Sequence, residues 1–319
     1  MQPNPDGLGF FAPNTTMTPE RIKLRCHAKV NLGLHILGKR EDGYHEIRTV
    51  LQTVGLHDTL EIRLTRGRGV SFQCNWDELN RGDNLVIRAL EAVCRHARLE
   101  RGLEARLEKR IPAGAGLGGG SSNAAAAVLG LDRLLGLRMS RRDWFEIGGA
   151  LGSDVPFFFV GGRALGVGRG SEVYPLEDAA PRHVLIVVPP RPMPTADAYG
   201  KASLRLTTPV NKSKIPLFCP AYLDALESGD GLENHFETVV FREQPDLKRL
   251  KQRLLQWGAR QSGLTGSGSA LVGLFDEKGA LTQAHAALRA GNVRLLATRT
   301  LTRDQYRHSL VECLQRAIG

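Results

Sequence analysis

The stretch that most constrains the fold of this chain is Pro112–Ala127, which reads PAGAGLGGGSSNAAAA. It holds five glycines and two serines, and the run of alanines that ends it favours a helix. Three structures fit such a pattern: a flexible linker, a dinucleotide-binding turn, or a loop whose backbone holds phosphate. These structures make different demands on the neighbouring residues, so the neighbours decide between them.

The residues on either side argue against a dinucleotide site. Leu103–Ile111 alternates apolar and charged residues, which is typical of a strand with one face in water, as in an antiparallel sheet. A dinucleotide site needs a buried parallel strand and an acidic residue after the next strand, whereas Asp132 lies inside an expected helix, Ser122–Leu135. No lysine lies between Gly114 and Ser122, so the Walker pattern is missing too.

A linker is disfavoured because a proline precedes the glycines and the helix follows them at once. The remaining interpretation is an anion site at the start of a helix, with Ser121 or Ser122 as the expected N-cap. The first-turn N–H groups lack partners within the helix, and the helix dipole adds positive charge there. Glycines allow an anion to approach the backbone. The stretch therefore predicts a phosphate cradle, with serine hydroxyls available to phosphate or Mg²⁺.

Periodicity elsewhere predicts an α+β fold rather than a doubly wound parallel sheet. Alternating or continuous apolar runs predict strands at Ile22–Val30, Ile47–Val54, Thr59–Leu64, Leu103–Ile111, His183–Val188 and Ala270–Phe275. Helical spacing predicts helices at Asn84–Arg98, Ser122–Leu135, Trp144–Ala150, Glu233–Glu243, Pro245–Trp257 and Leu281–Ala290. Polar Gly38–His45 is expected to be a loop, and Leu204–Pro220 shows no clear pattern.

Composition narrows the class of protein. The 319 residues carry a net charge of +10, which suits an anionic partner, but the basic residues form short groups typical of solvated helix faces. The five cysteines are widely spaced without a CxxC pair, which favours reduced thiols in a cytoplasm over disulfides or zinc. No apolar run reaches the ~18 residues of a membrane span. Residues 1–20 are expected to be a poorly ordered extension without a signal peptide.

Four motifs together resemble those of the GHMP kinase superfamily. The glycine stretch resembles its second motif, P-x-x-x-G-L-x-x-x-S-S-x-A-A, and Gly263–Ser269 resembles its third, glycine-rich motif. Gly152–Phe158 is similar to its catalytic aspartate segment, with Ser153 where alanine is more usual. Ala28–Leu32, with the loop GKREDGYH after it, resembles the N-terminal signature of one branch, whose substrate is a methylerythritol joined to cytidine diphosphate.

The resemblance implies a two-domain GHMP kinase fold with its active site in the cleft between the domains. The N-terminal, ATP-binding domain would occupy residues 21–180 and resemble the ribosomal protein S5 domain 2-like fold. The C-terminal domain would occupy residues 181–319 as a ferredoxin-like α/β sandwich.

The resemblance also implies a catalytic pair, Lys29 and Asp154. ATP, with Mg²⁺, would bind the residues that match the second motif: Pro112, Gly114, Gly116, Leu117, Gly118, Gly119, Gly120, Ser121 and Ser122. Without the resemblance, Asp154 could be a helix N-cap and Lys29 an exposed strand lysine, although Lys29 and Asn31 share one strand face by their spacing. The sequence does not identify the protein ligands of Mg²⁺.

The substrate residues implied by the resemblance lie in three segments. Tyr44 and His45 would form the cytosine pocket, and a second ring, Tyr199, would close it. Asn31 would bond the hydroxyl-bearing erythritol end, and Gly266 and Ser267 would steady the phosphate or that same end. Read from the residues alone, Tyr44 and His45 could be incidental rings in a polar loop, and the second glycine segment a tight turn.

The implied activity is ATP-dependent phosphorylation of the 2-hydroxyl of the methylerythritol part, in the non-mevalonate pathway to isoprenoid precursors. Two alternatives remain open: a mevalonate- or homoserine-type kinase, which would lack the GKREDGYH loop, and a non-catalytic basic binding protein, which would not need Lys29 and Asp154. The expected partner is a small molecule rather than nucleic acid or membrane. The expected state is a cytoplasmic monomer or weak homodimer.

Overall fold

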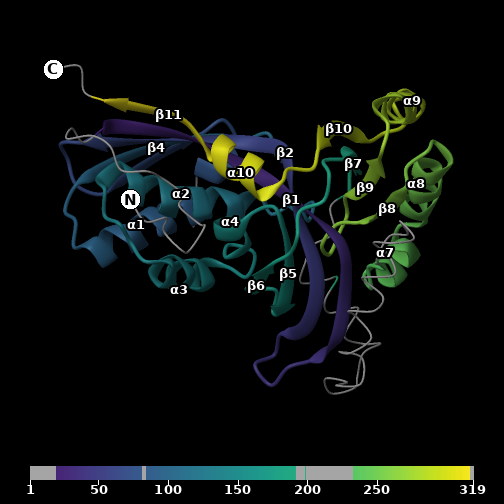
Figure 1. Ribbon diagram of the computed structural model, residues 1–319, viewed down its shortest axis with the longest axis horizontal. Coiled ribbons are helices and arrows are strands. Elements are labelled where there is room, and N and C mark those ends of the chain that lie inside the picture. Colours follow the sequence, from purple (N-terminus) through teal and green to yellow (C-terminus); the bar gives the residue numbers. More distant parts are fainter. Residues whose placement is uncertain (1–18, 81–83, 192–197, 199–232, 317–319) are drawn as a thin grey trace, which may run out of the picture.

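The computed structural model describes residues 19–80, 84–191, 198 and 233–316, and these form two sheets with helices packed on them (Figure 1). The large sheet has seven strands in the order β11-β1-β2-β4-β3, with β5 paired to β2 and β6 to β5. Its strands are β1 (Pro19–Lys39), β2 (His45–Thr65), β3 (Val70–Cys74), β4 (Gly102–Glu108), β5 (Arg163–Gly168), β6 (Glu172–Pro175) and β11 (Val311–Arg316). The small sheet is antiparallel, in the order β10-β7-β9-β8. Its strands are β7 (His183–Val188), β8 (Gln261–Leu264), β9 (Leu271–Phe275) and β10 (Arg294–Arg299).

Most of the helices form two groups, one packed against each sheet. Figure 1 shows one group beneath the large sheet: α1 (Leu85–Ala97), α2 (Gly119–Leu135), α3 (Arg141–Leu151) and α4 (Phe157–Val160). A second group lies beside the small sheet: α7 (Glu237–Glu243), α8 (Pro245–Gln256) and α9 (Lys278–Leu288). A short 3₁₀ turn, Asp77–Asn80, precedes α1, and α10 (Arg303–Leu310) precedes β11. This mixture of an antiparallel-rich sheet and packed helices confirms the predicted α+β class.

The helices predicted from spacing are present with shifted ends. Asn84 caps α1 by accepting the N–H of Val86 at 2.8 Å, and α7 begins four residues later than expected, at Glu237. None of the helices in the described ranges combines the length and the apolar character that crossing a membrane would require.

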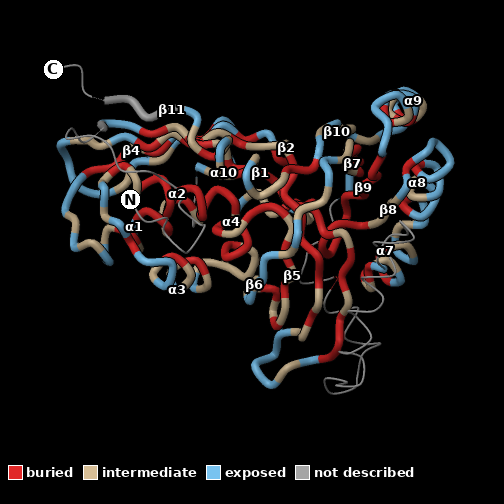
Figure 2. Tube along the Cα trace, viewed as in Figure 1, coloured by how far each residue is buried: buried red, intermediate tan, exposed pale blue. Residues whose placement is uncertain are grey.

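The β1–β2 hairpin is one long ribbon rather than several short strands. The expected strands Ile47–Val54 and Thr59–Leu64 are parts of β2, because a register shift at His27/Ala28 absorbs the irregularity between them. The ribbon takes part in three hydrophobic clusters. Ile22 and Leu24 lie in that of the large sheet, and Leu34 and Ile36 lie in that of the small sheet. Between them, Val30 lies in a third cluster that also holds residues of the small sheet. Figure 2 shows buried residues along most of the ribbon and exposed ones at its tip.

The end of the chain returns to the large sheet. β11 pairs antiparallel with β1, and the Tyr306 hydroxyl in α10 donates to the carbonyl of Phe158 at 2.5 Å. The predicted domain boundary at residue 180 therefore separates the two parts along the sequence only. In space, α10 and β11 pack with the large sheet and its helices.

Candidate active site

The glycine loop has a backbone that only glycine adopts readily. Gly114, Gly116 and Gly118 have φ values of 65°, 76° and 67°, in the left-handed region. Gly118 is the N-cap of α2 and no side chain caps the helix, so the prediction that Ser121 or Ser122 is the N-cap was wrong. Serine is the better cap by preference, but the tight left-handed turn at Gly118 starts the helix earlier.

This early start leaves the first N–H groups of α2 facing the loop. The first helical bond runs from Ser122 N to Gly118 O at 2.9 Å, so the preceding N–H groups have no acceptor within the helix. Gly120 is exposed and Ser121 half-buried, whereas Ser122 is buried. The loop and helix start therefore have the backbone geometry of an anion site.

The second and third glycine motifs lie directly against each other. A Cβ built on Gly116 would lie 2.2 Å from the carbonyl oxygen of Thr265, and one on Gly266 would lie 3.3 Å from Gly116. The Thr265 hydroxyl also donates to the Gly116 carbonyl at 3.2 Å. The structure thus brings Gly266 and buried Ser267 to the side of the glycine loop, called the phosphate loop below. This contact lies where the part built on the large sheet meets the part built on the small sheet.

Lys29 and Asp154 meet at this same junction, with Lys29 Nζ 3.4 Å from Asp154 Oδ2. The Lys29 side chain is 4% exposed and the Asp154 side chain 39%, so a buried cation faces a solvent-accessible carboxylate. The backbone N–H of Lys29 donates to Leu117 O at 3.0 Å, which fixes the lysine to the glycine loop.

These contacts exclude the simpler explanations of both residues. Lys29 is not a solvated strand lysine, because its side chain is buried. Asp154 does not cap α4, because that helix has Pro156 as its N-cap without a side-chain bond.

Asn31 connects the lysine to the third motif. Its Oδ1 accepts from Lys29 Nζ at 2.8 Å, its Nδ2 donates to Thr49 Oγ1 at 2.7 Å, and its backbone N–H donates to Thr265 Oγ1 at 3.0 Å. The amide oxygen also accepts from the Thr265 hydroxyl at 3.3 Å, so the carboxamide has three side-chain partners among the described residues. The second Nδ2 hydrogen is the group that a substrate hydroxyl could accept. Holding the Lys29 ammonium in place is the role that these contacts support directly.

Asn234 is a residue of the candidate site that sequence reasoning missed. Its Nδ2 donates to the carbonyls of Leu264 and Gly266, both at 2.9 Å, and its side chain is buried. These bonds shape the third motif where it packs on Gly116. A single asparagine in the run GLENHFE has no pattern that marks it before the fold is known.

Tyr44 and His45 lie at the tip of the β1–β2 hairpin, away from the catalytic pair. The stretch of β1 from Lys29 to Lys39 has a contour length of roughly 30 Å, and two bulges bend the strand along it. The Tyr44 ring is 53% exposed, and the Arg169 guanidinium lies over it at 4.7 Å.

The imidazole of His45 is suited to hydrogen bonding in its neutral form. Burial, with a smaller contribution from the charge of Lys39, lowers the pKa of His45 below its ordinary value. A neutral ring offers one donor and one acceptor. Tyr199, the predicted second ring, lies outside the described residues.

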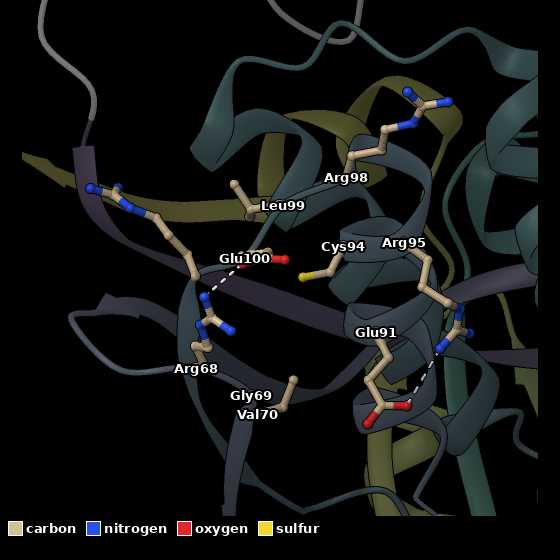
Figure 3. A pocket seen from close by; sticks show the side chains of 10 residues that line it. Arg68, Gly69, Val70, Glu91, Cys94, Arg95, Arg98, Leu99 and Glu100 are labelled. Carbon is tan, nitrogen blue, oxygen red and sulfur yellow. Dashed lines mark ion pairs between the residues drawn. The ribbon is translucent and has the colours of Figure 1, made fainter.

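A separate cavity of about 450 Å³ lies between α1 and the start of β3 (Figure 3). Two ion pairs line it, Arg68–Glu100 at 2.8 Å and Arg95–Glu91 at 3.8 Å. Burial raises the pKa of the Cys94 thiol beside them, which disfavours a reactive thiolate. None of the predicted site residues that the structure describes lines this cavity, so the candidate site remains the junction of the glycine motifs.

Comparison with known proteins places these motifs in a family context. The model of the GHMP kinase N-terminal domain matches residues 84–162, and that of the GHMP kinase C-terminal domain matches residues 222–293. The first range contains the phosphate loop and Asp154, and the second contains Asn234 and the third motif.

Relatives match most of the chain. A 4-diphosphocytidyl-2-C-methyl-D-erythritol kinase of Solibacter usitatus is 45% identical over 271 residues, covering 84% of this chain and 85% of the relative. One of Geobacter sulfurreducens is 35% identical, covering 88% of this chain and 100% of the relative.

Solved structures are similar over a comparable length. A crystal structure of 4-(cytidine 5'-diphospho)-2C-methyl-D-erythritol kinase has a TM-score of 0.74 at 34% identity, covering 88% of this chain and 99% of the other. A homoserine kinase from Cytophaga hutchinsonii has a TM-score of 0.70 at 19% identity, covering 91% and 98%, and shows likeness of fold alone.

Proposed function

The chain belongs to the 4-diphosphocytidyl-2-C-methyl-D-erythritol kinase family of GHMP kinases, and from this premise we propose how its residues carry out the reaction. It has the two-domain GHMP kinase fold and is an ATP-dependent kinase of the methylerythritol phosphate pathway, acting on an alcohol group. The observation that supports the residue roles best is the Lys29–Asp154 pair beside two interlocked glycine motifs.

ATP would bind with its phosphates on the glycine loop and on the start of α2. Phosphoryl transfer depends mainly on positioning and on neutralising charge, and free N–H groups with a helix dipole provide both. The terminal phosphate would lie toward Gly118, because Lys29 packs there: a Cβ on Gly118 would lie 2.9 Å from Lys29 Cγ. Two of the three ammonium donors of Lys29 face Asn31 and Asp154, which leaves one for the phosphate.

Asp154 would act as the general base. The 2-hydroxyl oxygen of the acceptor attacks the γ-phosphorus while the bond from that phosphorus to the β–γ bridging oxygen breaks, and ADP leaves. The hydroxyl proton passes to the Asp154 carboxylate, which is accessible enough for an acceptor to reach. Lys29 would stabilise the charge that develops on the phosphoryl oxygens.

Mg²⁺ would be held mainly by the phosphates of ATP, with an oxygen from Ser121 or Ser122. Mg²⁺ prefers oxygen ligands and commonly takes only one or two from the protein, so a hydroxyl at the helix start fits it. Buried Asp58 is unsuitable, because both of its oxygens already accept bonds from protein donors. The ion would supply charge neutralisation on the phosphates.

Substrate specificity should be visible in a panel of acceptors. The purified chain, with ATP and Mg²⁺, would be incubated separately with 4-diphosphocytidyl-2-C-methyl-D-erythritol, mevalonate, homoserine and galactose. We expect ADP and a phosphorylated product with the first acceptor alone, and no product when EDTA removes the metal. Product from another acceptor, with none from the diphosphocytidyl compound, would overturn the proposed specificity.

Tyr44→Ala should raise KM for the diphosphocytidyl substrate about tenfold, because stacking of a base on an aromatic ring contributes about 1–3 kcal/mol. The kcat and the KM for ATP should change little, since the ring is far from the phosphate loop along the hairpin. Tyr174→Ala is the matched control, because Tyr174 is 54% exposed and lies on β6. An unchanged KM in Tyr44→Ala would remove this tyrosine from the cytosine pocket.

We also propose a cytoplasmic location and a monomeric or weakly dimeric state. Two features support the cytoplasmic location. The reaction consumes ATP, and the cysteines are widely spaced, which suits reduced thiols. The catalytic pair and both glycine motifs come from one chain, which supports a site that needs no second copy.

A further inference from the structure

A single buried carboxylate contacts both ends of the phosphate loop. Asp58 lies on β2 with 0% of its surface exposed, and its Oδ1 accepts the backbone N–H groups of Arg110 and Ile111 at 2.7 and 2.8 Å. These two residues directly precede Pro112, where the loop begins. One oxygen of Asp58 thus holds the entry of the loop.

The other oxygen of Asp58 holds the exit. Its Oδ2 accepts from Asn123 Nδ2 at 2.9 Å and from the ammonium of Lys109. Lys109 Nζ also donates to Asn123 Oδ1 at 3.1 Å, which closes a triangle of three buried side chains. Asn123 lies just after Ser122 in the first turns of α2, so the triangle joins the strand side of the loop to its helix side.

Lys109 also lies directly beneath the start of the helix. A Cβ on Gly119 would lie 3.0 Å from Lys109 Nζ, so the ammonium is packed against the backbone that begins α2. Its charge is neutralised by Asp58, and the pair therefore adds little net charge to the phosphate site. A buried ion pair also contributes little net stability compared with apolar residues of similar size. Geometry is the property that this triangle supplies.

We propose that Asp58, Lys109 and Asn123 are positioning residues that hold the two ends of the phosphate loop at the spacing needed to bind ATP. The proposal rests on the proposed function, which supplies ATP as the ligand. The network keeps the loop's N–H groups oriented toward the phosphates before ATP arrives, so less ordering is needed on binding.

The first test measures the Kd of a non-hydrolysable ATP analogue, with Mg²⁺, for the full chain by calorimetry. Asn123→Ala removes the exit tie but keeps the Asp58–Lys109 pair, and we expect about tenfold weaker binding. Asp132→Asn is the matched control: it alters a buried carboxylate at the other end of α2, bonded to Met139 N and Trp144 Nε1. It should lower Tm without changing Kd. An unchanged Kd in Asn123→Ala would overturn the proposal.

The second test separates positioning from stability. Lys109→Met alone leaves the buried Asp58 carboxylate without a counter-charge and should lower both Tm and ATP affinity. Adding Asp58→Asn removes that charge, so Tm should recover while Kd stays about tenfold raised. Recovery of Kd together with Tm would show a merely structural role. If the unmodified chain binds no analogue, the proposed function fails as well, whereas normal binding by all variants overturns the network alone.

Discussion

Asp154→Asn is expected to lower kcat about 10³-fold, because an amide cannot take the proton of the acceptor hydroxyl. The buried Lys29 ammonium, whose side chain is 4% exposed, loses its counter-charge but keeps its bond to Asn31 Oδ1. The substitution keeps the shape of the side chain, so the geometry of the site should be preserved. Binding of ATP and of the acceptor should therefore change by less than about threefold. Steady-state kinetics and calorimetric binding on the same preparation would check both parts.

Asp276→Asn provides the control for this substitution. Asp276 has a 48% exposed side chain that pairs with Arg182 and with Arg260, each at 3.3 Å, so its exposure and cation distance are close to those of Asp154. It lies just after β9, outside the glycine motifs, and its replacement should leave kcat unchanged. Retention of a near-normal rate in Asp154→Asn would exclude this carboxylate as the base.

Gly116→Ala is expected to disrupt both the fold of the loop and the reaction. The new Cβ would lie 2.2 Å from the Thr265 carbonyl oxygen, and the residue would keep a φ of +76°. The second and third glycine motifs would have to move apart, which displaces the phosphate loop from its supporting contacts. We expect a loss of about 3 kcal/mol in the free energy of unfolding and a fall of more than about tenfold in kcat/KM.

The chain offers a control that isolates the steric effect. Gly136 ends α2 with a φ of +61°, and nothing lies within 4 Å of a Cβ built on it. Gly136→Ala should therefore show only the backbone penalty, about 1 kcal/mol, with normal kinetics. Thermal unfolding and kcat/KM of the two variants give the comparison. Equal effects in both would mean that contact between the two glycine motifs is unimportant.

Local structure was largely predictable from the sequence, whereas the contacts between distant segments were not. The spacing of Asn84–Arg98 predicted α1, because amphipathic period and capping act over neighbouring residues. The pairing of β11 with β1 was missed, since it joins residues from opposite ends of the sequence. The strands β3, β5, β6, β8 and β10 were missed too, being short segments whose pairing depends on the sheets they join.

The candidate site shows the same division. The composition of the glycine loop was enough to predict an anion site. Lys29 and Asp154 were predicted to act together only through a family resemblance, because their contact joins β1 to the turn before α4. Asp58, Lys109 and Asn234 were not singled out at all. Each is one polar residue whose burial and partners exist only after folding. The N-cap error had a local cause, since residue preference does not report the φ of Gly118.

The pairing of β11 with β1 has a consequence for synthesis on the ribosome. β1 is among the first described segments to emerge, but its outer neighbour, Val311–Arg316, is among the last. During most of translation the nascent large sheet therefore carries an open edge, which is a template for pairing with another chain. Until the final strand closes that edge, the growing polypeptide exposes an unpaired strand that is open to intermolecular association.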